Sequence, residues 1–412
     1  MIEAIHSHRR TRFPLPFPSV KSRQPIALAT LLIPGFQADA EIEVTQSYDY
    51  SYQLYQEDDD RMRIEAHYIR GQFDFNEATT FRFQWLNDAI SGASPTGLLP
   101  GTYQPFYANV EDVRTGILGA LAHKFGDHRV ELEVSRSEED DYLSYGFALS
   151  DAWELNQKNT VISYGLNYLD DTVSVPALGD RKKNTYDLFA GVTQIIDKNT
   201  LVTANLTLGF SEGYLNDPYK LIQRNEVLDP GGLNVPLINV YRENRPDSRF
   251  RQVLQFEGKR YFEDAKGALD AVLRFSHDDY GVFSQTLQIE WRQEVGEHFE
   301  VTPFARYYHQ SAADFFMNTL NGVRFPTPSP DDPRGAPPVD PNGSGPNYSS
   351  DYRLSSLDVI SLGLRLRYQF NDHFAMNAAY ERYMMDGSGS DSAPDLAYPS
   401  ANIWTVGLNF DF

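Results

Sequence analysis

From Glu41 to the C-terminus, apolar and polar residues alternate in runs of roughly 10–15 positions, and a turn follows each run. In the last run the apolar residues at alternate positions are Trp404, Val406, Leu408, Phe410 and Phe412. Polar or small residues lie between them. A period of two residues is typical of β-strands, whose successive side chains point to opposite faces of a sheet. The pattern predicts about sixteen strands.

The connections between these strands alternate between short and long. Short turns such as Gly126-Asp127 and Asn371-Asp372 alternate with longer connections, of which the prominent ones are 90–109, 212–248, 311–356 and 386–400. Short periplasmic turns, long extracellular loops and an even strand number are the signature of an outer-membrane barrel. Soluble propellers and sandwiches also alternate, but they lack this asymmetry of loop length. We therefore predict an all-β fold, a transmembrane antiparallel up-and-down barrel of about sixteen strands formed by residues 41–412.

Residues 1–40 have the composition of a secretory signal peptide. The basic residues of its first part are Arg9, Arg10, Arg12, Lys21 and Arg23. A short apolar run over 26–36 follows, and Ala38-Asp39-Ala40 then matches an A-x-A cleavage site. We predict cleavage after Ala40 and location of the mature chain in the outer membrane of a Gram-negative-type bacterium.

The composition excludes several classes of protein. The chain of 412 residues has 57 acidic and 36 basic residues, a net charge of -21, which argues against binding to nucleic acid. It has no cysteine, so disulfides, thiol catalysis and cysteine-ligated metals are excluded. Aromatic residues make up 13% of the chain, too many for a disordered protein. No apolar run of roughly 20 residues indicates a membrane-spanning helix.

Aromatic residues gather near the predicted strand ends, where outer-membrane barrels carry aromatic girdles. They are Tyr48, Tyr50, Tyr52, Tyr55, Trp153, Tyr307, Tyr308, Tyr380 and Tyr383. The terminal strand ends in Phe410 and Phe412, which resembles the signal that delivers such barrels to their assembly machinery. The expected partners therefore include the barrel-assembly machinery and outer-membrane lipid.

Two segments carry specific motifs. The first is DAISGASPTG at 88–97, and the second is SHDDYG at 276–281, which continues into PFARYYHQSAADFF at 303–316. They resemble a family of bacterial outer-membrane β-barrel proteins that is classed as a domain of unknown function. The resemblance covers most of the mature chain and implies its fold and location. It implies no catalytic residues.

Charged residues occupy alternate positions of several predicted strands, which we interpret as the inner face. They are Arg61, Arg63, Glu65, Arg114, Arg249, Arg251, Glu290, Arg292, Arg306, Arg365 and Arg367. Rows of arginines and carboxylates select small polar solutes in a diffusion channel. Alternatively, these charges pair with one another and fill the barrel. A barrel of about sixteen strands is wide enough for water, which favours a channel with loop 311–356 as its constriction or lid.

Loop 311–356 is rich in proline, which favours extended and exposed conformations. Within it, Asp340, Asn342, Ser344 and Asp351 have the spacing of ligands in a calcium loop. The alternative is a solvated surface loop, and no other cofactor is expected. We keep calcium as a candidate.

The sequence favours a channel over an enzyme. Two other hypotheses remain. One is a non-conducting scaffold barrel that binds a secreted or redox protein at its loops. The other is a hydrolase at the extracellular rim, which would use His277 with Asp278 and Asp279, or His309 with Asp314.

Overall fold

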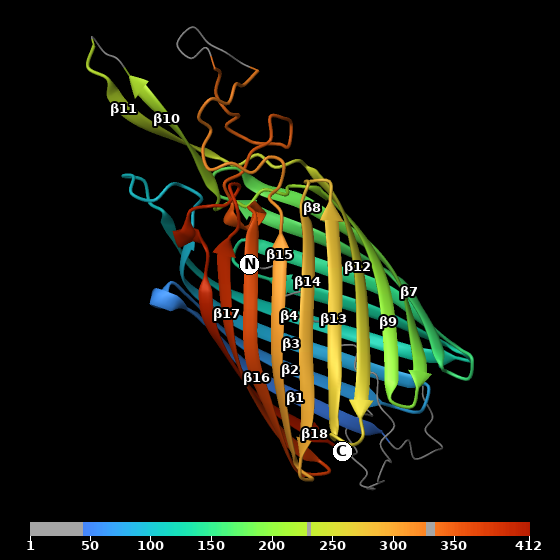
Figure 1. The fold of residues 1–412 in the computed structure, drawn as a ribbon. Helices are drawn as coiled ribbons and strands as arrows, with labels where there is room; N and C mark the ends of the chain where they lie inside the picture. The colour runs from blue at the N-terminus through green and yellow to red at the C-terminus, as the bar shows by residue number, and fades with distance from the viewer. Residues whose placement is uncertain (1–43, 229–231, 327–333) are drawn as a thin grey trace.

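The computed structural model describes residues 44–228, 232–326 and 334–412, so the predicted signal peptide and its cleavage site lie outside the described residues. Within these residues, sixteen antiparallel strands form a closed barrel (Figure 1). Each strand pairs with its neighbours in the sequence, except that β12 pairs with β9 and that β1 closes the barrel against β18. The predicted all-β barrel is confirmed.

The barrel strands are β1 (Thr45–Glu57), β2 (Met62–Asp74), β3 (Thr79–Pro95), β4 (Tyr107–Phe125), β5 (His128–Glu138), β6 (Tyr142–Leu155), β7 (Thr160–Val175), β8 (Gly179–Asp197), β9 (Thr200–Gly213), β12 (Ser248–Phe262), β13 (Gly267–Asp278), β14 (Phe283–Val295), β15 (Phe299–Gln310), β16 (Leu357–Asn371), β17 (Phe374–Gly387) and β18 (Ser400–Asp411). Short 3₁₀ helices are η1 (Asp58–Asp60), η2 (Tyr352–Leu354) and η3 (Asp395–Ala397). No helix in the described ranges is long and apolar enough to cross a membrane.

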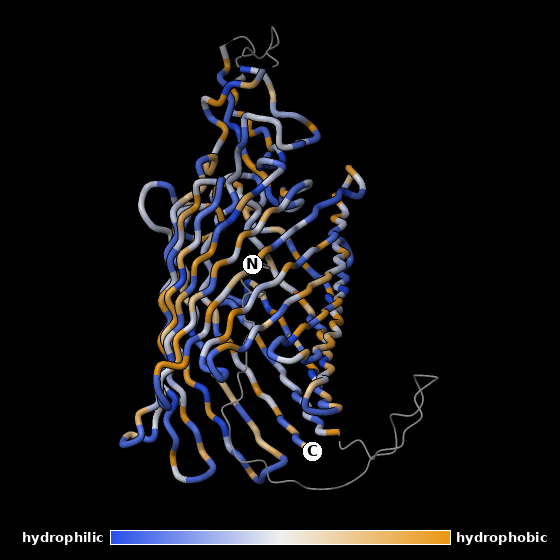
Figure 2. Tube along the Cα trace, turned by 90° about the vertical axis from the view of Figure 1, so that its right-hand side faces the viewer, coloured by the Kyte–Doolittle hydropathy of each residue, from blue (hydrophilic) through white to orange (hydrophobic). Residues whose placement is uncertain are grey.

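The outer surface of the barrel is apolar because strand residues alternate in direction. On β4, Val113, Ile117 and Leu121 are exposed, whereas Ala120 and Ala122 on the opposite face are buried. The tube in Figure 2 shows the same alternation of hydrophobic and hydrophilic residues along neighbouring strands. A closed barrel with an apolar exterior satisfies its backbone hydrogen bonds internally and meets lipid outside, so this is an outer-membrane barrel.

The two ends of the barrel differ in their connections. Tight turns such as 126–127 and 372–373 join strands at the periplasmic end. At the extracellular end the long connections are 96–106, 214–247, 311–356 and 388–399, and we call their described parts the loop layer. In Figure 1 the long connections lie above the barrel strands. Strands β3 and β4 extend into the predicted loop 90–109, because their backbone pairing continues as far as Pro95 and Tyr107.

The segment 212–248, predicted as a long extracellular loop, contains regular structure that the sequence analysis did not predict. This connection contains a two-stranded antiparallel sheet of β10 (Leu221–Leu228) and β11 (Val235–Arg242), which projects beyond the barrel (Figure 1). Neither strand shows the apolar–polar alternation of the barrel strands. Because they pair only with each other, the count of barrel strands stays at sixteen.

The loop layer has apolar cores of its own. One cluster joins Tyr352 to the start of β16 and to Ala393, Ala397 and Tyr398 of the last loop. A second joins Ala313, Phe315 and Leu354 to Tyr280 and Val282, and a third joins Leu320, Phe325 and Tyr348 to Ile222 of β10. The expectation of an extended, exposed loop 311–356 was therefore wrong for these segments, because their aromatic residues pack against other connections.

Candidate functional site

The inner wall carries a charged pair near the middle of the barrel. Arg365 of β16 donates to both carboxylate oxygens of Glu290 on β14, at 2.7 and 3.1 Å. Its guanidinium lies 4.4 Å from the ring centre of Phe304, on the strand between them. Gln288 also donates to Glu290, at 2.6 Å. Two of the predicted lumen residues therefore pair with each other across β15.

A second pair lies where β12 and β13 reach the loop layer. Nε of Arg249 donates to Asp278 at 2.8 Å, and the guanidinium lies 4.8 Å from the ring centre of Tyr280. The same carboxylate accepts the backbone N–H groups of Tyr280 and Val282, at 3.1 and 3.0 Å. Asp278 thus fixes the turn that follows β13. His277, its neighbour in the sequence, is exposed on the opposite face.

Among the described residues, no hydrogen bond joins His277 to Asp278 or Asp279, and none joins His309 to Asp314. His277 and Asp278 point to opposite faces of β13, as successive strand residues must. His309 contacts Asp358 at 2.9 Å on the outer face, where Tyr307 also donates to Asp358. The backbone N–H of Asp314 donates to Tyr280, inside the second cluster of the loop layer.

Arg114 faces inward but is buried instead of lining open space. Its guanidinium donates to both oxygens of Asp88, and Glu139 lies 4.0 Å away. Burial raises the pKa of Glu139, which follows β5, to about 7, although the charge of Arg114 opposes this shift. The carboxylates of Asp112, Glu139 and Asp141 have oxygens within 4.8 Å of one another and could hold a metal ion. Sequence analysis missed this group because Asp112 comes from β4, whereas Glu139 and Asp141 come from the turn between β5 and β6.

The remaining arginines of the inner wall lie at different depths. Arg292 and Arg367 are near the periplasmic end, where they contact Glu300 at 3.4 Å and Gln369 at 2.9 Å. Arg251 lines a small cavity with Arg249 and Asp187 of β8. Arg306 of β15 alternates with the outward-facing Tyr307, so it points inward.

The interpretation of Arg63 and Glu65 as lumen residues was wrong. Residues that pair across strands share a face, and the pairs Tyr52–His67 and Tyr52–Val406 place these positions of β2 outside, with the exposed Val406. Arg63 and Glu65 pair with each other there at 2.6 Å. The inner positions of this part of β2 are occupied by the apolar Met62, Ile64 and Ala66.

Arg61 is not a lumen residue either. It follows η1 at the extracellular rim, where its Nε lies 2.5 Å from Glu57. Its Nη1 donates to the backbone oxygens of Leu396 and Ala397, at 2.9 and 3.3 Å. Arg61 therefore ties the first hairpin to the loop 388–399. The charged alternation of 61–65 misled the assignment because period two defines two faces without saying which one is inside.

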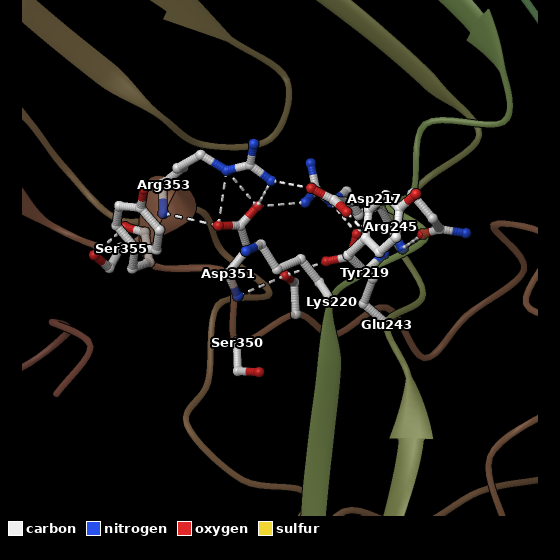
Figure 3. A network of polar contacts seen from close by, with 12 residues as sticks. Asp217, Tyr219, Lys220, Glu243, Arg245, Ser350, Asp351, Arg353 and Ser355 are labelled. Carbon is white, nitrogen blue, oxygen red and sulfur yellow. Dashed lines mark hydrogen bonds and ion pairs between the residues drawn. The ribbon is translucent and has the colours of Figure 1, made fainter. Parts of the chain in front are cut away.

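A buried network of ion pairs joins the two longest connections (Figure 3). Asp351 accepts from Arg353 at 2.9–3.0 Å and from Arg245 at 2.7 Å, and Arg353 also binds Asp217. Arg245 lies 2.8 Å from Glu243, which accepts from the hydroxyl of Ser349 at 2.6 Å. We call these charged residues the latch: Asp217, Lys220, Glu243, Arg245, Asp351 and Arg353.

The charges of the latch are largely buried and stabilise one another electrostatically. Burial alone would raise the pKa of Asp351, but Arg353, Lys220 and Arg245 hold it well below its ordinary value. Burial raises the pKa of Glu243 in spite of the opposing charge of Arg245. The side chains of Asp351 and Glu243 are 0% and 1% exposed. Each buried charge of the latch therefore needs its oppositely charged partner, and removal of one partner leaves the other charge buried and unpaired.

The calcium candidates meet other partners in this arrangement. Asp351 is held by arginines of the latch, and Asp340 accepts from Arg181 at 2.9 Å. The side-chain oxygen of Asn342 accepts from the hydroxyl of Ser344 at 2.6 Å. Both carboxylates are already paired with guanidinium groups, which argues against calcium at this place.

The terminal phenylalanines and the aromatic residues divide between the two faces. Phe410 stacks on Phe374 of β17, with ring centres 5.0 Å apart, and Phe412 is exposed. Their role as an assembly signal stays a prediction. Tyr55, Tyr308 and Tyr383 point inward, so they do not belong to an outer girdle; Tyr308 and Tyr383 pack against the first cluster of the loop layer.

A family model described as "Protein of unknown function (DUF3570)" matches residues 24–107 and 99–409. This match confirms the resemblance that the two sequence motifs indicated. No curated protein matches the chain.

Several solved structures of outer-membrane proteins are similar to this chain. A bacterial polysaccharide outer membrane secretin is 10% identical, with a TM-score of 0.48 over 91% of this chain and 100% of that one. CdiB from Acinetobacter baumannii is 10% identical, with a TM-score of 0.49 over 89% of this chain and 60% of that one. OmpT of Vibrio cholerae is 9% identical, with a TM-score of 0.40 over 90% of this chain and 97% of that one. At these identities the likeness concerns the fold alone.

Proposed function

The chain belongs to this family of proteins of unknown function, and we propose that it is an outer-membrane channel for small hydrophilic solutes. The observation that carries the proposal is the inner wall, where the pair of Glu290 and Arg365 lies at mid-depth and further arginines lie toward both ends. Charged side chains are stable on an inner wall when water reaches them, and a barrel of sixteen strands is wide enough to hold an aqueous path.

In this proposal the loop layer is the lid of the channel. Its clusters join loop 311–356 to β10 and to the strand ends, and the latch connects the same loop to residues 214–247. A layer with cores and buried ion pairs closes more firmly than a set of solvated loops. Opening then requires rearrangement of part of this layer.

The test of the channel is planar-bilayer conductance of the refolded mature chain, residues 41–412. We expect discrete conductance steps, and a shift of ion preference toward cations when Arg365→Gln and Arg367→Gln remove two inner positive charges. Arg63→Gln is the matched control, because it removes the same charge from the outer face. Silence of the native chain under all voltages would contradict the proposal.

One observation favours the scaffold hypothesis as a second candidate. The projecting sheet of β10 and β11 carries exposed apolar residues near its tip, Val227, Leu233 and Val235. Exposed apolar side chains that lie together on a projecting ribbon suit contact with a protein partner. This function requires no conductance, so silent bilayers together with a partner whose binding is lost when these three residues become serine would replace the channel proposal.

A further inference from the structure

A row of inner-wall residues lies directly below the loop layer. Gln288, Arg306, Ser361 and Tyr383 pair in succession across β14, β15, β16 and β17. The next row of the inner wall toward the extracellular end contains Tyr308, Val359 and Met385. Val359 belongs to the first cluster of the loop layer, and Tyr308 and Met385 pack against it. The row of Arg306 is therefore the first level of the wall beneath this cluster.

Two neighbouring donors of this row have no acceptor. Nε of Arg306 and the hydroxyl of Ser361 are both buried, and neither has a hydrogen-bond partner among the described residues. These residues face each other across β15 and β16. Proteins rarely bury a donor without an acceptor, so two such donors side by side indicate a place for an acceptor that the chain itself does not supply.

The surrounding charge is positive. Arg306 and Arg251 are close enough to Arg274 of β13 for their charges to repel it. Arg274 donates to the neutral Gln255, at 2.7 and 2.9 Å. Two carboxylates of the same wall are engaged elsewhere, Asp278 by Arg249 and Glu290 by Arg365, and Glu381 of β17 lies one row nearer the periplasm, opposite Gly363. Asp187 shares a small cavity with Arg249 and Arg251, on the side away from Arg306.

We propose that Arg306, Ser361 and Arg274 form a binding site for an oxyanion, such as the phosphate, sulfate or carboxylate group of a solute. Guanidinium groups match the geometry of oxyanions, and a serine hydroxyl adds a neutral donor. The site deepens the proposed channel function, on which it rests for its place on the solute path. Anionic solutes are then the class of solute that binds below the loop layer.

The test is binding of inorganic phosphate to the purified mature chain in detergent, measured by isothermal titration calorimetry at low ionic strength. We expect saturable binding, weakened about tenfold or more by Arg306→Gln, because a charge-assisted hydrogen bond is lost. Ser361→Ala should weaken it by a smaller factor. Arg292→Gln is the matched control, since it removes an inner arginine that pairs with Glu300 near the periplasmic end, and it should leave binding unchanged.

Folding of each variant is checked by its circular dichroism and by its thermal transition. Should Arg306→Gln fail to fold, Ser361→Ala and Arg306→Lys carry the test, because lysine keeps the charge but lacks the Nε donor. Absence of phosphate binding by the native chain, or equal weakening by Arg292→Gln, would overturn the site. If the native chain binds phosphate but does not conduct, the oxyanion site is supported and the channel function is contradicted. If it conducts but does not bind phosphate, the channel function is supported and the oxyanion site is contradicted.

Discussion

Ion pairs occur in two regions of this molecule, the inner wall and the loop layer, and the two regions differ in their access to water. On the inner wall, the side chains of Arg365 and Glu290 are 24% and 17% exposed. In the latch, Asp351 is fully buried between Arg245 and Arg353. The same chemistry therefore serves two purposes: partly solvated charges on the wall set the field of a lumen, and buried charges hold segments together.

The largest effect is expected where a buried charge loses its partner. Asp351→Asn leaves Arg245 and Arg353 without their shared carboxylate, which should destabilise the loop layer by roughly 3–5 kcal/mol. Hydrogen exchange should then become faster in 311–356 and 214–247 but not in the barrel strands. Asp340→Asn is the control, because its pair with Arg181 lies at the surface and contributes little. Equal hydrogen-exchange protection of the loop layer in Asp351→Asn and Asp340→Asn would contradict a stabilising role of the latch.

A smaller effect is expected from pH. The pKa of Glu139 is about 7 in the folded protein, against an ordinary value of 4.5, so the folded state keeps a proton that the unfolded state has released. The contribution of Glu139 to stability should therefore be highest below about pH 4.5 and fall as the pH rises toward 7, by at most about 3 kcal/mol. Thermal unfolding between these pH values measures it, and Glu139→Gln should lose this component. If the native chain lost no more stability than Glu139→Gln between pH 4.5 and 7, the raised pKa of Glu139 would be contradicted.

On the inner wall the expected change is in selectivity more than in stability. Arg365→Gln removes one partner of a partly solvated pair, so we expect a loss of about 1 kcal/mol or less. The reversal potential in a salt gradient should shift toward cations. Glu290→Gln should shift it in the opposite direction, and two shifts of the same sign would contradict a lumen lined by this pair.

The smallest effect is expected from a variant that tests the orientation of β2, in which Arg63 faces outward. Arg63→Gln removes a charge from the outer face, where the side chain is 49% exposed. We expect unchanged ion preference and a change in stability below roughly 0.5 kcal/mol. If Arg63→Gln shifted the reversal potential as far as Arg365→Gln does, the outward orientation of Arg63 would be contradicted.

The sequence was sufficient for the barrel but not for its loop layer. Alternation over runs such as 404–412 determines strands, and the asymmetry of the connections determines which end carries the loops. Alternation does not say which face is inside when both faces are mixed. Arg63 and Glu65 share their strand with the apolar Ile64 and Ala66, and only the register with β1 shows that the charges lie outside.

The latch could not be predicted from spacing along the chain. Arg245 and Asp351 are separated by more than a hundred residues, and their pairing depends on how the loops fold over one another. The sheet of β10 and β11 gave no such signal, since neither LIQRNEVL nor VPLINVYR alternates between apolar and polar residues. It was overlooked because the whole segment 212–248 was assigned to one loop.

The most direct test of the channel uses the absence of cysteine from the chain. A single thiol placed at Gln288→Cys faces the lumen, and one at Leu287→Cys, the adjacent residue, faces lipid. We predict that a charged methanethiosulfonate reagent reduces the bilayer current of Gln288→Cys and leaves that of Leu287→Cys unchanged. Current that is equally insensitive in both variants, or no current in either, would contradict a solute path through this barrel.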